Sequence, residues 1–177
     1  MVVAEKGLIA AMNAAKNNTG YKVGRDDSRI FIYTIGWMVR FQIKKVPRKV
    51  LGLLAEHLGE LPARNTAYEV KKRDVQECMF QVSSSEASMF FRSGNGHRLA
   101  KTGFTYNGES LWLDVVEEKA VQIPPKDEAL VDSNEPCILE DSVVTIQGDH
   151  SLVAFILPKV AEGDKDLMER LGQVIAV

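Results

Sequence analysis

PRKVLGLLAEHLGELP, residues 47–62, is the clearest helix signal in the chain, and the rest of the fold is organised around it. At about 100° per residue its aliphatic side chains fall within one arc of about 100°; they are Val50, Leu51, Leu54, Leu58 and Leu61. Pro47 suits a first helical position, and Pro62 stops the helix. Burying such side chains is worth roughly 1.5–3 kcal/mol each before entropy is subtracted, so we expect a core helix.

The opposite side of this helix is a stripe of small residues: Gly52, Ala55 and Gly59. A glycine inside a helix costs about 1 kcal/mol relative to alanine. One interpretation is that both glycines are merely tolerated, with Gly59 near a frayed end. The other is that a second element or a second subunit approaches the backbone closely here. The stripe is therefore a candidate interface.

Hairpin signals surround the helix. Residues 37–44 alternate between apolar and polar side chains, which is typical of a half-buried strand. The pairs Asn95-Gly96 and Asn107-Gly108 are typical of tight hairpin turns. We predict further strands at 21–24, 30–35, 67–72, 75–82, 89–92, 101–106, 109–116, 120–123, 143–146 and 152–157. We predict helices at 3–17 and from Asp164 onward, and a surface loop or linker at 124–136.

These elements predict an α+β fold: an antiparallel, hairpin-rich sheet with about three helices packed on it, in a single domain covering residues 1–177. The segments 27–62 and 141–177 both read strand, turn, strand, helix, which suggests a degenerate β-β-α internal duplication. The matched residues are Val39, Phe41, Lys45 and Val46 with Val153, Phe155, Lys159 and Val160. Chance similarity is the alternative. A duplication would place equivalent helices on one side of the sheet and make Gly172 the counterpart of Gly59, hence a fourth interface candidate.

Composition indicates a soluble globular chain of ordinary make-up. The apolar fraction is 45% and the charged fraction is 26%. No apolar run approaches the ~20 residues that a membrane-spanning helix needs, and the N-terminus lacks the features of a signal peptide. Cys78 and Cys137 form neither a disulfide framework nor a zinc pattern. We therefore expect a cytoplasmic protein that does not associate with membranes.

Charge is distributed unevenly along the chain. Residues 1–104 contain 17 Lys and Arg against 9 Asp and Glu, whereas residues 105–177 contain 5 against 15. This asymmetry indicates a basic binding face, attraction between the halves or subunits, or mere scatter. The candidate nucleic-acid contacts are Lys44, Lys45, Arg48, Lys49, Lys71, Lys72, Arg73, Arg92, Arg98 and Lys101. Basic side chains neutralise phosphates, but lysines also protect the edges of sheets.

No catalytic constellation, metal site or cofactor site is predicted. His57 lies on the apolar side of the main helix and is expected in the core or an interface, whereas His97 and His150 are expected in solvent. The sequence contains no G-x-S-x-G elbow and no P-loop. We therefore expect a non-catalytic binding or assembly protein that associates with itself or another protein. A nucleic-acid-binding protein is the alternative, and an enzyme with an unrecognised site is less favoured.

Overall fold

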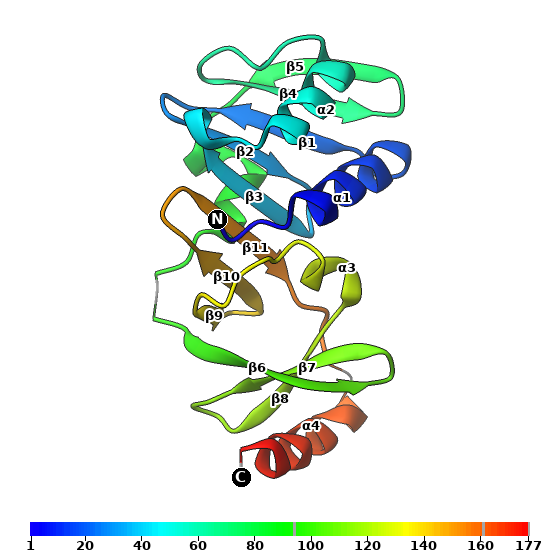
Figure 1. Cartoon of the computed structure of the whole chain (residues 1–177), viewed down its shortest axis with the longest axis vertical. Coiled ribbons are helices and arrows are strands. Elements are labelled where there is room, and N and C mark those ends of the chain that lie inside the picture. The colour runs from blue at the N-terminus through cyan, green and yellow to red at the C-terminus, as the bar shows by residue number, and fades with distance from the viewer. Residues whose placement is uncertain (94, 161, 177) are drawn as a thin grey trace.

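The α+β class is confirmed by a computed structural model, which describes residues 1–93, 95–160 and 162–176. Within these residues the chain forms one antiparallel sheet of 11 strands in the order β5-β4-β1-β2-β3-β11-β10-β9-β6-β7-β8 (Figure 1). The strands are β1 (Tyr21–Arg25), β2 (Arg29–Tyr33), β3 (Trp37–Gln42), β4 (Thr66–Lys71), β5 (Asp74–Met79), β6 (His97–Tyr106), β7 (Glu109–Asp114), β8 (Lys119–Ile123), β9 (Cys137–Glu140), β10 (Val143–Gln147) and β11 (Ser151–Ile156). Figure 1 shows β5 and β8 at opposite ends of the long axis of the molecule.

Four α-helices accompany the sheet in the described residues, one more than expected. They are α1 (Glu5–Asn17), α2 (Arg48–Leu58), α3 (Pro125–Glu128) and α4 (Glu162–Ile175), and the 3-10 helices are η1 (Ile43–Lys45), η2 (Val82–Ser84) and η3 (Glu86–Phe90). The additional helix, α3, is a single turn. It lies in the segment 124–136, which we predicted as a surface loop or linker.

The main core lies on one face of the sheet, which we call the helix face. There α1 contributes Leu8 and α2 contributes Val50 and Leu54, and these pack in one cluster with Ile32 and Val39 of the sheet. The aliphatic arc of the predicted helix therefore faces the core as expected. On the opposite face, η2 and η3 cover the strands β2, β3 and β11 through a second cluster that includes Phe80 and Phe90.

The C-terminal helix α4 lies on the opposite face from α2, so the expectation of equivalent helices on one side of the sheet is wrong. Met168 packs with Leu111 and Ala120, whereas Trp112, the neighbour of Leu111 in β7, belongs to the helix-face core. The helix face already holds Val2, Val3 and Leu130 in addition to α1 and α2. The apolar side chains on the opposite face of β7 and β8 are what α4 covers.

The segment 124–136 is not a linker, because Leu130 within it belongs to the core, although many of its residues are exposed as a surface loop would be. Leu130 is fully buried, and its carbonyl oxygen accepts a hydrogen bond from the Ala4 N–H at 2.9 Å. The Asp132 N–H donates to the Val2 carbonyl at 3.0 Å. These two hydrogen bonds fix the segment against the N-terminus. Composition alone did not reveal this contact because the segment is rich in proline and acidic residues.

The predicted hairpin over residues 89–96 is also wrong. Phe90 ends the 3-10 helix η3, and β6 pairs with β9 and β7 rather than with residues 89–92. Gly96 allows β6 to approach β9, because an added Cβ would lie 2.3 Å from the Leu139 carbonyl oxygen. Gly94, which also belonged to the predicted turn, lies outside the described residues. The second Asn-Gly pair does connect β6 and β7, with φ of 51° at Asn107 and 80° at Gly108.

The two predicted repeat segments have the same strand registers. Ile32 pairs with Val39 in the first hairpin, and Ile146 pairs with Val153 in the second. The two hairpins meet where Val39 of β3 pairs with Val153 of β11, at the middle of the sheet. A duplication predicts such a correspondence, but the opposite placement of α2 and α4 does not follow from it, so the duplication stays a prediction.

Candidate functional site

The strand β5 is an open edge of the sheet. All six of its residues are exposed, and only β4 pairs with it among the described strands. Val75 is 41% exposed and Met79 is 86% exposed, although both are large apolar residues. An exposed edge strand without proline or a bulge is a template for pairing with another chain. The strand is therefore the first candidate interaction site.

The backbone of β5 presents alternate residues to solvent. The Phe80 N–H donates to the Asn65 carbonyl at 2.9 Å, which continues the β4–β5 ladder by one residue. In an antiparallel pair, the backbone N–H and C=O groups of every second residue point toward the same neighbouring strand. Val75, Glu77 and Met79 therefore direct their N–H and C=O groups away from the sheet. No other part of the described chain pairs with these groups.

The opposite edge, β8, is packed against α4. Gly172 of α4 is buried, and a Cβ added there would lie 2.1 Å from the Glu118 carbonyl oxygen and 2.7 Å from the Ala120 nitrogen. The Lys119 ammonium group forms an ion pair of 3.3 Å with Glu169 of the same helix. The two edges of one sheet therefore have different surroundings.

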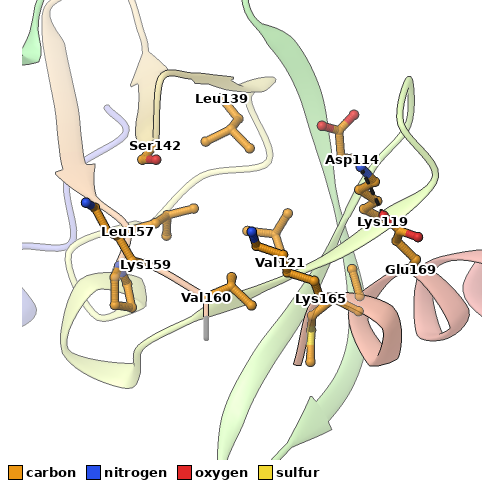
Figure 2. A pocket seen from close by; sticks show the side chains of 13 residues that line it. Asp114, Lys119, Val121, Leu139, Ser142, Leu157, Lys159, Val160, Lys165 and Glu169 are labelled. Atoms are coloured by element: carbon orange, nitrogen blue, oxygen red, sulfur yellow. Dashed lines mark ion pairs between the residues drawn. The ribbon is translucent and has the colours of Figure 1, made fainter. Parts of the chain in front are cut away.

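A cleft of about 530 Å³ lies beside the β8 edge and is the second candidate site. Figure 2 shows Leu157 and Lys159 on one side of this cleft and Asp114, Lys119 and Glu169 on the other. Its walls are mainly apolar.

The buried carboxylate of the cleft, Asp114, is held by groups outside it. Asp114, which is 4% exposed, accepts a hydrogen bond at 3.0 Å from the backbone N–H of both Val116 and Glu117, and its second oxygen lies 3.0 Å from Nδ1 of His97. The pairing with Asp114 corrects our expectation that His97 is simply solvated. Ser142 has no side-chain hydrogen bond to a basic group within the described part of the chain.

The four predicted interface residues have different surroundings. Gly52, Ala55 and Gly59 are exposed, and nothing in the described chain lies within 4 Å of a Cβ added at Gly52 or Gly59. The φ of 79° at Gly59 explains this glycine as the end of α2, because L-residues rarely adopt it. Gly172 makes its close approach within the chain, to β8. Only Gly52 and Ala55 remain as exposed residues that local structure does not explain.

The predicted nucleic-acid contacts do not form one continuous surface. Lys44, Lys45, Arg48 and Lys49 follow the end of β3. Lys71 ends β4, and Lys72 and Arg73 form the turn between β4 and β5. The antiparallel order of β1–β4 places these two groups at opposite ends of their strands. Arg98 and Lys101 lie on β6, in the other half of the sheet, and Arg92 lies between η3 and β6. All ten side chains are exposed.

The remaining histidines agree in part with expectation. His57 is buried, and its Nδ1 lies 2.7 Å from the hydroxyl oxygen of Tyr21. Burial and the nearby Lys16 lower the pKa of His57, which favours the neutral ring at neutral pH. His57 is thus a core residue, as one of our alternatives held. His150 is exposed.

Sequence reasoning missed the open edge because a strand pattern does not say which neighbour a strand has. The exposed Met79 was a weak signal, since an isolated methionine is normal on a surface. None of the helices among the described residues is long and apolar enough to cross a membrane. Comparison with family models, curated proteins and solved structures finds no match.

Proposed function

We propose that the protein is a non-catalytic assembly protein that self-associates by pairing β5 of one copy with β5 of a second copy. The observation that carries this proposal is the open edge: three residues of β5 direct their backbone groups to solvent beside the exposed Val75 and Met79. Such pairing continues the sheet from one copy into the next and satisfies these groups.

A second copy suits this edge because an antiparallel strand can pair with itself about a two-fold axis. In a register centred on Val75, Arg73 of one copy lies opposite Glu77 of the other, and the contact occurs twice. The outward groups of Val75 would then bond to those of its own counterpart. The exposed residues Gly52 and Ala55 of α2 lie on the helix face and are candidates for an extension of this contact.

Light scattering on a Glu77→Pro variant tests the proposal. Proline at position 77 removes an outward N–H but leaves the inward bonds of Gln76 and Cys78 to β4 intact. We expect a dimeric parent and a folded, monomeric Glu77→Pro protein. Glu77→Gln is the matched control: it keeps the N–H and loses only the exposed Arg73–Glu77 contacts, worth about 1 kcal/mol or less each, so it is expected to remain a dimer. A parent that is monomeric throughout, or a Glu77→Pro dimer as stable as the parent, contradicts the proposal.

Salt distinguishes this dimer from a charge-complementary contact. Residues 1–93, which form the β5 half of the sheet, contain 15 Lys and Arg against 9 Asp and Glu. Pairing two β5 edges brings two positive halves together, so added salt should strengthen the dimer. A contact between the basic half of one copy and the acidic half of another should instead weaken with salt.

Nucleic-acid binding is the second candidate function, and the positive charge of the β5 half favours it. An oligonucleotide that binds this half should lose affinity steeply as salt rises. Fluorescence anisotropy with a labelled oligonucleotide tests the idea, and Lys44→Gln with Lys45→Gln serves as the variant. Binding that is insensitive to salt, or unchanged in this double variant, argues against a phosphate contact there.

The internal duplication and the cytoplasmic location remain part of the proposal. The equal registers of the two hairpins support a common origin of residues 27–62 and 141–177, and the different faces of α2 and α4 oppose it. Cys78 is a free, exposed cysteine, which suits a reducing compartment.

A further inference from the structure

A half-buried arginine without an acidic partner lies near the middle of the sheet. Arg40 of β3 has Phe31 and Leu152 as its cross-strand neighbours, on the face opposite α1 and α2. Its guanidinium group makes no hydrogen bond or ion pair with any other described residue. Because charged groups are costly to desolvate without a partner, this position is unfavourable for the folded protein alone.

The electrostatic surroundings of Arg40 are unfavourable to its positive charge. Burial lowers the pKa of Arg40, and the neighbouring Arg29 guanidinium lowers it further, while the carboxylate of Asp26 raises it. Asp26 is already committed to Arg29, with a shortest ion-pair distance of 2.6 Å. The nearby carboxylate therefore does not neutralise Arg40.

Arg40 lines a cavity of about 310 Å³ that combines apolar and polar walls, a size suited to a small organic molecule. Phe90, Ile138 and Leu152 form apolar surface, and Thr145 and Gln147 of β10 add a hydroxyl and an amide. Each strand contributes alternate residues to this face, which brings side chains of β3, β11, β10 and β9 together.

The other charged groups of the cavity leave it with a surplus of positive charge. Arg92 and Glu140 line it together with Arg40. Oε1 of Glu140 accepts hydrogen bonds from the backbone N–H and the hydroxyl of Ser93, at 3.2 and 2.6 Å. The single carboxylate is thus held by the segment that follows η3, and two arginines line the same cavity.

We propose that this cavity binds a small organic anion whose carboxylate or phosphate pairs with Arg40 and whose apolar body lies on Ile138, Leu152 and Phe90. A guanidinium group binds either oxyanion through two parallel hydrogen bonds. This site is independent of self-association through β5, because it lies at the middle of the sheet.

Amide NMR titrations with benzoate, phenyl phosphate and benzyl alcohol test the proposal. At least one anion, added up to about 10 mM, should shift the amide signals of Thr145, Gln147 and Leu152, whereas the neutral alcohol should not. Comparison of the two anions identifies the preferred oxyanion. Arg40→Gln should weaken binding by about tenfold or more, Arg40→Lys by less, and the control Arg48→Gln on α2 should bind like the parent.

A stability measurement separates a ligand-binding role from a structural one. If Arg40 serves a ligand, Arg40→Met should raise the unfolding midpoint while abolishing anion binding, because it removes an unpaired half-buried charge. Arg40→Lys keeps the charge and provides a binding readout should a neutral substitution unfold the protein. The proposal is overturned if neither anion shifts these signals, if benzyl alcohol binds as tightly, or if folded Arg40 variants bind unchanged.

Discussion

The two edge strands of this sheet, β5 and β8, differ in whether another element packs against them. At β8, α4 packs against the edge strand, and Gly172 lets the helix backbone approach that of Glu118–Ala120. At β5 no described element lies beyond the strand in the sheet, and all six of its residues are exposed. At β8 one helix thus packs against the edge strand, and the absence of such a packed element at β5 is what makes that strand a candidate for pairing.

The two halves of the sheet also differ in charge. The half that ends at β5 is positive, and the half that ends at β8 contains 15 Asp and Glu against 7 Lys and Arg in residues 95–177. The asymmetry along the sequence is therefore also an asymmetry in space, because the sequence halves are nearly spatial halves. The open edge belongs to the basic half, which gives β5 pairing its expected strengthening by salt.

Opening the closed edge should produce the largest effect on stability. Gly172→Leu places side-chain atoms where the backbone of Glu118–Ala120 lies. We expect a loss of about 3 kcal/mol or more in the free energy of unfolding, or release of α4. Urea denaturation measures the loss, and limited proteolysis within residues 164–176 detects the release. A stability equal to that of the parent would mean that α4 does not hold this edge.

The closed half should also be sensitive to pH through Asp127 of α3. Burial, aided by Glu109 and opposed by Lys126, raises the pKa of this carboxyl to about 6. Because the folded state holds the proton more tightly than the unfolded chain, stability should fall as the pH rises from about 4 to 6. Asp127→Asn should therefore stabilise the protein at pH 8 by about 1–3 kcal/mol.

Denaturation of the parent and Asp127→Asn at pH 4 and pH 8 checks this sign. The difference between the two proteins should shrink toward the lower pH, where the parent carboxyl is protonated in the folded state and about half protonated in the unfolded chain. A difference that grows on acidification would mean that Asp127 has a stabilising partner when it is ionised.

Gly52→Ala sharpens the contrast between Gly52, the exposed glycine of α2, and Gly172, the buried glycine of α4. Open space surrounds position 52, and it lies inside α2. We expect a gain of about 1 kcal/mol in the free energy of unfolding of the monomer, by the helix preference for alanine. Thermal denaturation at low concentration measures it. If the same variant weakens the dimer, Gly52 lies at a close contact between copies; a loss of monomer stability would contradict its open surroundings.

The smallest expected effect on folding is that of Met79→Ser at the open edge. The methionine is 86% exposed, so its replacement should change the free energy of unfolding by less than about 0.5 kcal/mol. The same change should weaken self-association, because Met79 adds apolar area to β5. Sedimentation equilibrium measures the association, with Val115→Ser, at the exposed turn after β7, as the matched control. Equal association of parent and Met79→Ser would remove this side chain from the contact.

Local patterns in the sequence were sufficient for the class and for most elements. The aliphatic arc of α2, the alternation in β3 and the Asn107-Gly108 turn each depend on neighbours in sequence, and the structure contains all three. The hairpin predicted at 89–96 is wrong because Gly96 packs against β9, about 40 residues further along the chain. The Asn95-Gly96 pair resembles a turn, and only the strand order reveals the contact of Gly96 with β9.

The candidate sites depend on contacts between residues far apart in the sequence, so most of them could not be predicted from it. Gly172 was predicted at an interface, and its packing against β8 could not be known before the face of α4 was known. In the sequence, Arg40 is an ordinary polar residue of an alternating strand. That it has no acidic partner can be seen only in the structure, where β2, β11 and η3 surround it. The open edge likewise required the full strand order.

Hydrogen exchange at β5, followed at low and high protein concentration, tests the central claim most directly. The inward amides of Gln76 and Cys78 should be protected at both concentrations by β4. The outward amides of Val75 and Glu77 should exchange freely at low concentration and become protected when copies pair. If the outward amides exchange freely at every concentration, β5 is not the pairing edge and the proposed assembly is wrong.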